Sequence, residues 1–215
     1  MTMREAVALD VFGAAARLKV PVGAWRWAAA IGLVPPPDAA PDRWSTATVA
    51  AVDTEGVRAA LVSTSARTAA ERLTAALGDP LPPLRPAVTA RMIGDLTRAG
   101  ALLRLEGPMD TPVVHVDQVT ALTRRRDLPA LLDRHTLYGP DQAAVRLGLR
   151  RTDLDHFLPR TLLTPARTAV VDFGKARGGE VAVDLYRGQD VGRAAGTGWA
   201  SARSGQLSWT AASWA

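Results

Sequence analysis

The chain has 215 residues, with 26 Lys or Arg, 21 Asp or Glu and a formal net charge of +5. It has no Cys, and its three His, at positions 115, 135 and 156, lie far apart. These features exclude a disulfide scaffold, thiolate catalysis and Cys-ligated zinc, and they offer no His spacing suited to a metal. We find neither a signal peptide nor an apolar stretch long enough to span a membrane, so we expect a cytoplasmic protein.

The first quarter of the chain predicts three helices. Apolar side chains near the helical period predict a helix over residues 5–18. A second helix is expected over 23–31 and stops at Gly32. Ser45 is expected to cap a third helix that runs to about residue 53, because its hydroxyl can accept a bond from the first free N–H groups.

The middle of the chain predicts three further helices and a hairpin. Helices are expected over 66–77, 87–99 and 118–125, the last of them capped by Asp117. Residues 101–106 and 111–116 are apolar and extended around a Gly-Pro turn, so we expect these two stretches to pair as a hairpin.

The last part predicts short helices over 128–132, 141–147 and 153–158. Residues 168–174 and 180–186 flank a Gly-bearing turn and predict a second hairpin. From residue 194 onward the chain is rich in Gly, Ser and Ala, with isolated Trp, so a disordered tail is expected over 194–215.

One pattern occurs three times along the chain. An Ala-rich helix ending in Arg-Leu stands at 14–18, at 69–73 and at 143–147, and each is followed by a break, a second helix and an extended stretch. We expect Leu18, Leu73 and Leu147 to face the cores of separate modules. The order predicts a mainly α fold with short β-hairpins, built as tandem winged helix-turn-helix modules over 1–53, 54–126 and 127–193.

The first module resembles the DNA-binding domain of MerR-type regulators and of the related excisionase family. The matching stretches are Ala15-Ala16-Arg17-Leu18, Trp25-Arg26-Trp27, Gly32-Leu33-Val34-Pro35 and Arg43-Trp44-Ser45. The resemblance implies a bacterial DNA-binding protein whose second helix enters the major groove, with Arg26, Arg43 and Trp44 contacting DNA. The alternative is that the tryptophans at 25 and 27 only pack the core.

The third module carries more exposed positive charge, since residues 124–190 contain twelve basic and nine acidic residues. Candidate DNA contacts in the presumed reading helix and its preceding turn are Arg150, Arg151, Thr152, His156 and Arg160. Lys175 and Arg177 stand at the expected hairpin tip, where a duplex backbone would pass. Asp153 and Asp155 could accept hydrogen bonds from cytosine or stabilise the helix start. The triple Arg at 124–126 is either a phosphate contact or a solvated helix end.

No nucleotide-binding glycine loop, nucleophile elbow or carboxylate pair is found, so we expect no catalysis, no cofactor and no metal. The predicted function is non-enzymatic binding of double-stranded DNA, in transcription regulation or nucleoid architecture. The alternative is a protein-interaction adaptor built on the same modules. A protein partner that docks on the Trp-bearing tail is a further interpretation.

Overall fold

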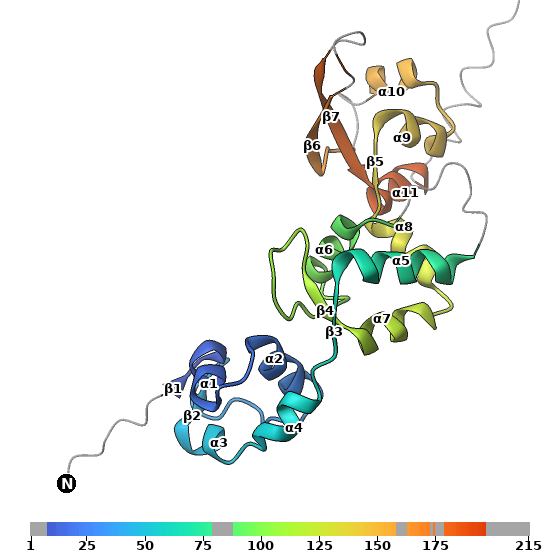
Figure 1. Cartoon of the computed structure of the whole chain (residues 1–215). Coiled ribbons are helices and arrows are strands. Elements are labelled where there is room, and N and C mark those ends of the chain that lie inside the picture. Colours follow the sequence, from blue (N-terminus) through green and yellow to red (C-terminus); the bar gives the residue numbers. More distant parts are fainter. Residues whose placement is uncertain (1–7, 79–87, 158–162, 173, 175–178, 197–215) are drawn as a thin grey trace, which may run out of the picture. The chain divides into compact units, whose positions relative to one another are not determined.

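The computed structural model describes residues 8–78, 88–157, 163–172, 174 and 179–196 (Figure 1). This part of the chain is mainly helical, with antiparallel sheets of two or three strands. It divides into two compact units, one ending at Leu128 and the other beginning at Pro129. None of the described helices is both long enough and apolar enough to cross a bilayer.

One arrangement occurs three times: a strand, two helices, a strand antiparallel to the first, and a closing helix that follows it directly. The first copy consists of β1 (Ala8–Leu9), α1 (Val11–Leu18), α2 (Val22–Ala30), β2 (Trp44–Ser45) and α3 (Thr46–Ala50). The second consists of β3 (Ser63–Ser65), α5 (Ala66–Leu77), α6 (Ala90–Arg98), β4 (Val113–His115) and α7 (Val116–Thr123). The third consists of β5 (Leu137–Tyr138), α9 (Pro140–Leu147), α10 (Arg151–Phe157), β6 (Arg167–Asp172), β7 (Glu180–Arg187) and α11 (Gly188–Gly196).

Two other helices stand before the second and third copies. They are α4 (Thr54–Ala59) and α8 (Leu128–His135). The helix expected over 128–132 is therefore longer than predicted, and α4 was not predicted at all. With six residues and a single buried apolar side chain, that of Val57, α4 is too short to show a helical period in the sequence.

Each copy is closed by strands far apart in the sequence. Leu9 pairs with Trp44, Thr64 with Val114, and Tyr138 with Tyr186. In the third copy β7 is central, in the order β5-β7-β6. The second copy has the same plan in reduced form, because β4 pairs with β3 and also bridges from Val113 to Glu106.

The repeated Ala-Ala-x-Arg-Leu segment occupies the same place in α1, α5 and α9. Its first Ala stands four residues after the N-cap, and its Leu eight residues after it, with Asp10, Ser65 and Gly139 as the N-caps. All six alanines of the three pairs are buried, and Leu73 is too, while Leu18 and Leu147 are half-buried against separate cores. Their small methyl groups let a neighbouring helix approach closely. The predicted equivalence of these three helices is confirmed.

Capping explains where several helices begin. The hydroxyls of Ser45 and Ser65 each accept a bond from the backbone N–H three residues later, which confirms the Ser45 cap. The predicted Asp117 cap is wrong, because β4 runs straight into α7 and the cap is His115, whose Nδ1 accepts from the Asp117 N–H at 3.1 Å. The helix expected over 87–99 starts only at Ala90, after its cap Thr89.

Three further expectations need correction. The helix expected over 5–18 begins at Val11, and Asp10 caps it after β1 has paired with β2. Residues 101–106 and 111–116 form no regular hairpin, because β4 takes β3 as its partner and leaves only the bridge at Glu106. The boundary expected at 194 is too early, since α11 continues to Gly196 and buries Val191 and Ala194. Residues 197–215 of the expected tail lie outside the described residues.

Candidate nucleic-acid interface

In the third copy, a tight turn joins α9 to α10 and exposes one face of α10. Gly148 ends α9 in the left-handed conformation, with φ of 68°. Leu154 is 2 % exposed and fixes the inward side of α10. Arg150, Arg151 and Thr152 have exposed side chains, so three predicted DNA contacts lie together at the start of this helix.

Carboxylates compensate the charge of Arg151. Its guanidinium pairs with Asp155 and, at 3.2 Å, with Asp141. The hydrogen bond from Arg151 to Asp155 raises the pKa of Arg151, against a small opposing effect of burial. Asp153 accepts from the backbone N–H of Arg150 at 3.4 Å. Both aspartates therefore have structural partners at the helix start, in line with the second of the two interpretations of their role.

Arg150 differs from its neighbour, since its exposed side chain forms no ion pair within the described part of the chain. His156 lies in the last turn of α10. Arg160, Lys175 and Arg177 lie outside the described residues. Arg150 is thus the predicted contact of the third copy whose charge is most available to a phosphate.

A two-stranded hairpin follows α10 in the chain, as predicted. In β6 and β7, six residue pairs are in register, from Arg167 opposite Leu185 to Asp172 opposite Glu180. The N–H of Gly179 donates to the carbonyl of Gly174 at 3.0 Å and closes the turn. Figure 1 shows the hairpin extending from the sheet beside α9 and α10. The hairpin predicted over 168–186 is confirmed.

Arg26, a predicted contact of the first copy, is engaged inside the first unit. Its Nη1 donates to the carbonyl of Leu105 at 2.7 Å, and its guanidinium lies 5.6 Å from the centre of the Phe12 ring. Burial, and next the charge of Arg104, lower the pKa of Arg26, while Glu106 opposes them. Residues 105 and 106 therefore cover part of the helix that the MerR resemblance assigns to the major groove.

The other two predicted contacts of the first copy have opposite environments. Trp44 is 6 % exposed, and its Nε1 donates to the carbonyl of Pro35 at 2.8 Å. Its ring meets the fully buried Trp25 edge to face, with centroids 5.3 Å apart. Trp44 is therefore a core residue rather than a surface open to a duplex, whereas Arg43 is exposed.

The triple Arg at 124–126 follows α7. Arg125 forms two hydrogen bonds with Asp127, at 2.8 and 2.7 Å, and these raise its pKa. Arg124 and Arg126 have exposed side chains. This geometry matches a solvated helix end at Arg125 and leaves two arginines on the surface.

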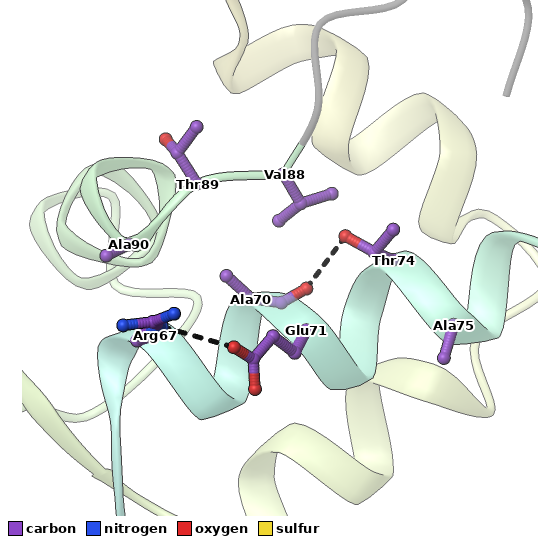
Figure 2. A pocket seen from close by; sticks show the side chains of 8 residues that line it. All are labelled: Arg67, Ala70, Glu71, Thr74, Ala75, Val88, Thr89 and Ala90. Atoms are coloured by element: carbon purple, nitrogen blue, oxygen red, sulfur yellow. Dashed lines mark hydrogen bonds and ion pairs between the residues drawn. The ribbon is translucent and has the colours of Figure 1, made fainter.

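A hollow of about 500 Å³ lies between α5 and the start of α6. Figure 2 shows Arg67 and Glu71 side by side on α5, and the structure pairs them at 3.3 Å. The Thr74 hydroxyl donates to the carbonyl of Ala70 at 2.9 Å. These polar groups bind one another, and the remaining lining is largely alanine and valine, so the hollow presents no catalytic set. No group of His, Asp and Glu suited to a metal occurs among the described residues.

No protein family, curated protein or solved structure matches this chain. The interpretation of its surfaces therefore rests on geometry. Sequence reasoning missed the part played by Leu105 and Glu106, because a backbone carbonyl and a lone carboxylate before a turn carry no recognisable pattern. His115, which lies between two valines of a strand, was a visible signal of a buried polar role.

Proposed function

We propose that the protein binds double-stranded DNA without catalysis, as a transcription regulator or an architectural factor. The observation that carries the proposal is the order of the third copy. A helix, a tight turn, an exposed second helix and an antiparallel hairpin follow one another, as in winged helix-turn-helix modules. The recurrence of the same strand and helix order in the other copies supports a tandem arrangement of such modules.

The exposed start of α10 supplies the chemistry. An α-helix fits the major groove, where Arg reads guanine and Thr contacts bases or the thymine methyl group. Arg150 and Thr152 project from one exposed end of this helix. The β6/β7 hairpin would then lie along the phosphate backbone, which positions the helix without reading sequence.

A specific observation favours protein binding as a second function. In the first copy, the face of α2 that would read DNA contacts the second copy through Gly23, Arg26 and Trp27. The same module shape thus binds protein within this chain. An adaptor would use α10 in a similar way, with a protein partner in place of DNA.

The test is a titration of the full-length protein with a fluorescent random-sequence duplex at two salt concentrations, with the single strand as a control. We expect duplex binding that weakens steeply with salt. Arg150→Ala should reduce affinity and lower the salt slope by about one unit. Arg151→Ala should have a smaller effect, because carboxylates already compensate that charge. An absence of salt-dependent duplex binding would reject the proposal in favour of the adaptor.

A further inference from the structure

A hollow of about 800 Å³ opens in the first unit between the first copy and the segment around residues 100–104. Trp25 and Trp44 contribute to its lining, together with Phe12 and Leu103. Phe12 is 58 % exposed, which is unusual for a large apolar side chain. The volume lies in the usual range for small-molecule sites, and these side chains offer an apolar surface to a ligand.

Two arginines form a basic side of this hollow. Arg26 and Arg104 both line it. The bond from Arg26 to the carbonyl of Leu105 places its guanidinium beside the residue that follows Arg104. Neither arginine forms an ion pair with a carboxylate of the described residues, so the two positive charges face each other without a bridging anion. A carboxylate between them would relieve that repulsion.

Two aspartates form an acidic side. Asp10 and Asp42 line the same hollow. Because Leu9 pairs with Trp44, the residues that come next at this end of the β1–β2 sheet lie near each other. Asp10 uses Oδ1 to accept from the N–H of Gly13 at 2.8 Å, whereas Asp42 is exposed in a left-handed turn with φ of 57°. Neither carboxylate is in an ion pair within the described ranges.

We propose that this hollow binds a small zwitterion with a large apolar side chain, of the chemical class of the aromatic α-amino acids. Its carboxylate binds between Arg26 and Arg104, and its ammonium group binds Asp42 and Asp10. Its side chain packs on Phe12 and on the tryptophans. A lining with two positive and two negative charges around an apolar surface matches a zwitterion better than a simple anion or cation. The proposal does not depend on DNA binding.

The experiment measures binding of three probes to the full-length protein by calorimetry. L-phenylalanine carries both charges, 3-phenylpropanoate lacks the ammonium group, and 2-phenylethylamine lacks the carboxylate. We expect L-phenylalanine to bind about tenfold more tightly than either analogue, a difference of about 1.4 kcal/mol. Equal affinities for the three probes, or an absence of phenylalanine binding at millimolar concentration, would overturn the proposal.

Variants separate the two charged sides. Arg104→Gln should lower phenylalanine affinity to that of the amine and leave amine binding unchanged. Asp42→Asn, which tolerates the left-handed backbone, should lower it to that of phenylpropanoate. Phe12→Ala should weaken all three probes, whereas Leu33→Ala removes another exposed apolar side chain, one that does not line the hollow, and should weaken none. Thermal unfolding followed by circular dichroism checks that each variant is folded. If Leu33→Ala reduces binding as much as Phe12→Ala does, the site lies elsewhere.

Discussion

The indole of Trp27 stacks on the imidazole of His115, with ring centroids 3.9 Å apart and planes 9° from parallel. His115 is 1 % exposed, and its Nδ1 accepts from the N–H of Asp117, so Nε2 carries the proton and donates to the carbonyl of Ala60 at 2.9 Å. A ring held at both nitrogens is a rigid platform. Trp27 therefore joins the first copy to the second through a fixed partner.

The stack should contribute measurably to the stability of the first unit. We expect Trp27→Ala to lower the free energy of unfolding by about 2 kcal/mol, through lost burial and lost stacking. Trp27→Phe keeps an aromatic ring over His115 and should lose less than half of that. Urea unfolding followed by circular dichroism measures both variants. If Trp27→Ala and the wild type unfold at the same urea concentration, the stack contributes nothing to the fold.

The bond from Arg26 to Leu105 is a second link between these copies. Arg26→Met keeps much of the apolar stem but leaves the carbonyl without this donor, and it should cost about 1–2 kcal/mol. Arg43→Met is the matched control, because Arg43 is exposed, and it should stay within about 0.5 kcal/mol of the wild type. Both changes are compared by chemical denaturation. Equal effects of the two substitutions would show that the Leu105 bond is not formed in solution.

Two glycines of α11 predict opposite effects on stability. A Cβ on Gly188 would lie 1.9 Å from the carbonyl oxygen of Asp133, whereas one on Gly192 would meet nothing within 4 Å. Gly188→Ala should therefore destabilise the second unit by about 3 kcal/mol through backbone displacement. Gly192→Ala should stabilise it by about 0.5–1 kcal/mol, because alanine is the better helix former. Melting temperatures measure both, and a stabilising Gly188→Ala would show that α11 does not pack as described.

Asp38 predicts a pH dependence at the acid end. Hydrogen bonds from the Thr48 hydroxyl, at 2.5 Å, and from the backbone N–H and hydroxyl of Ser45, both at 2.7 Å, lower the pKa of Asp38 from 3.8 to about 2. These bonds favour the charged form, so their stabilisation is complete above the unfolded-state pKa and is lost as the pH falls toward about 2. An NMR titration of the Asp38 carboxyl carbon measures this pKa directly. A midpoint near 4 would mean that the three bonds do not form in solution.

The sequence by itself determined the elements whose stability is local. The helix expected over 66–77 is found with the same bounds, because its cap, its alanines and its terminal Gly78 act within one or two helical turns. The same holds for the place of the Ala-Ala-x-Arg-Leu segment in each copy. The β6/β7 hairpin was also predictable, since its two strands are joined by a short turn with glycines at both ends.

Only the tertiary structure decided which surfaces remain open. β1 and β3 have two and three residues, too few for any alternation to show, and they exist because partners some 35 to 50 residues away pair with them. The cover over Arg26 and the burial of Trp44 have the same origin, since in each case a distant backbone carbonyl accepts the side-chain hydrogen bond. An arginine or tryptophan has the same identity whether it faces solvent or a neighbouring carbonyl. Its availability to DNA or another partner therefore depends on contacts between distant segments, which one-dimensional patterns do not contain.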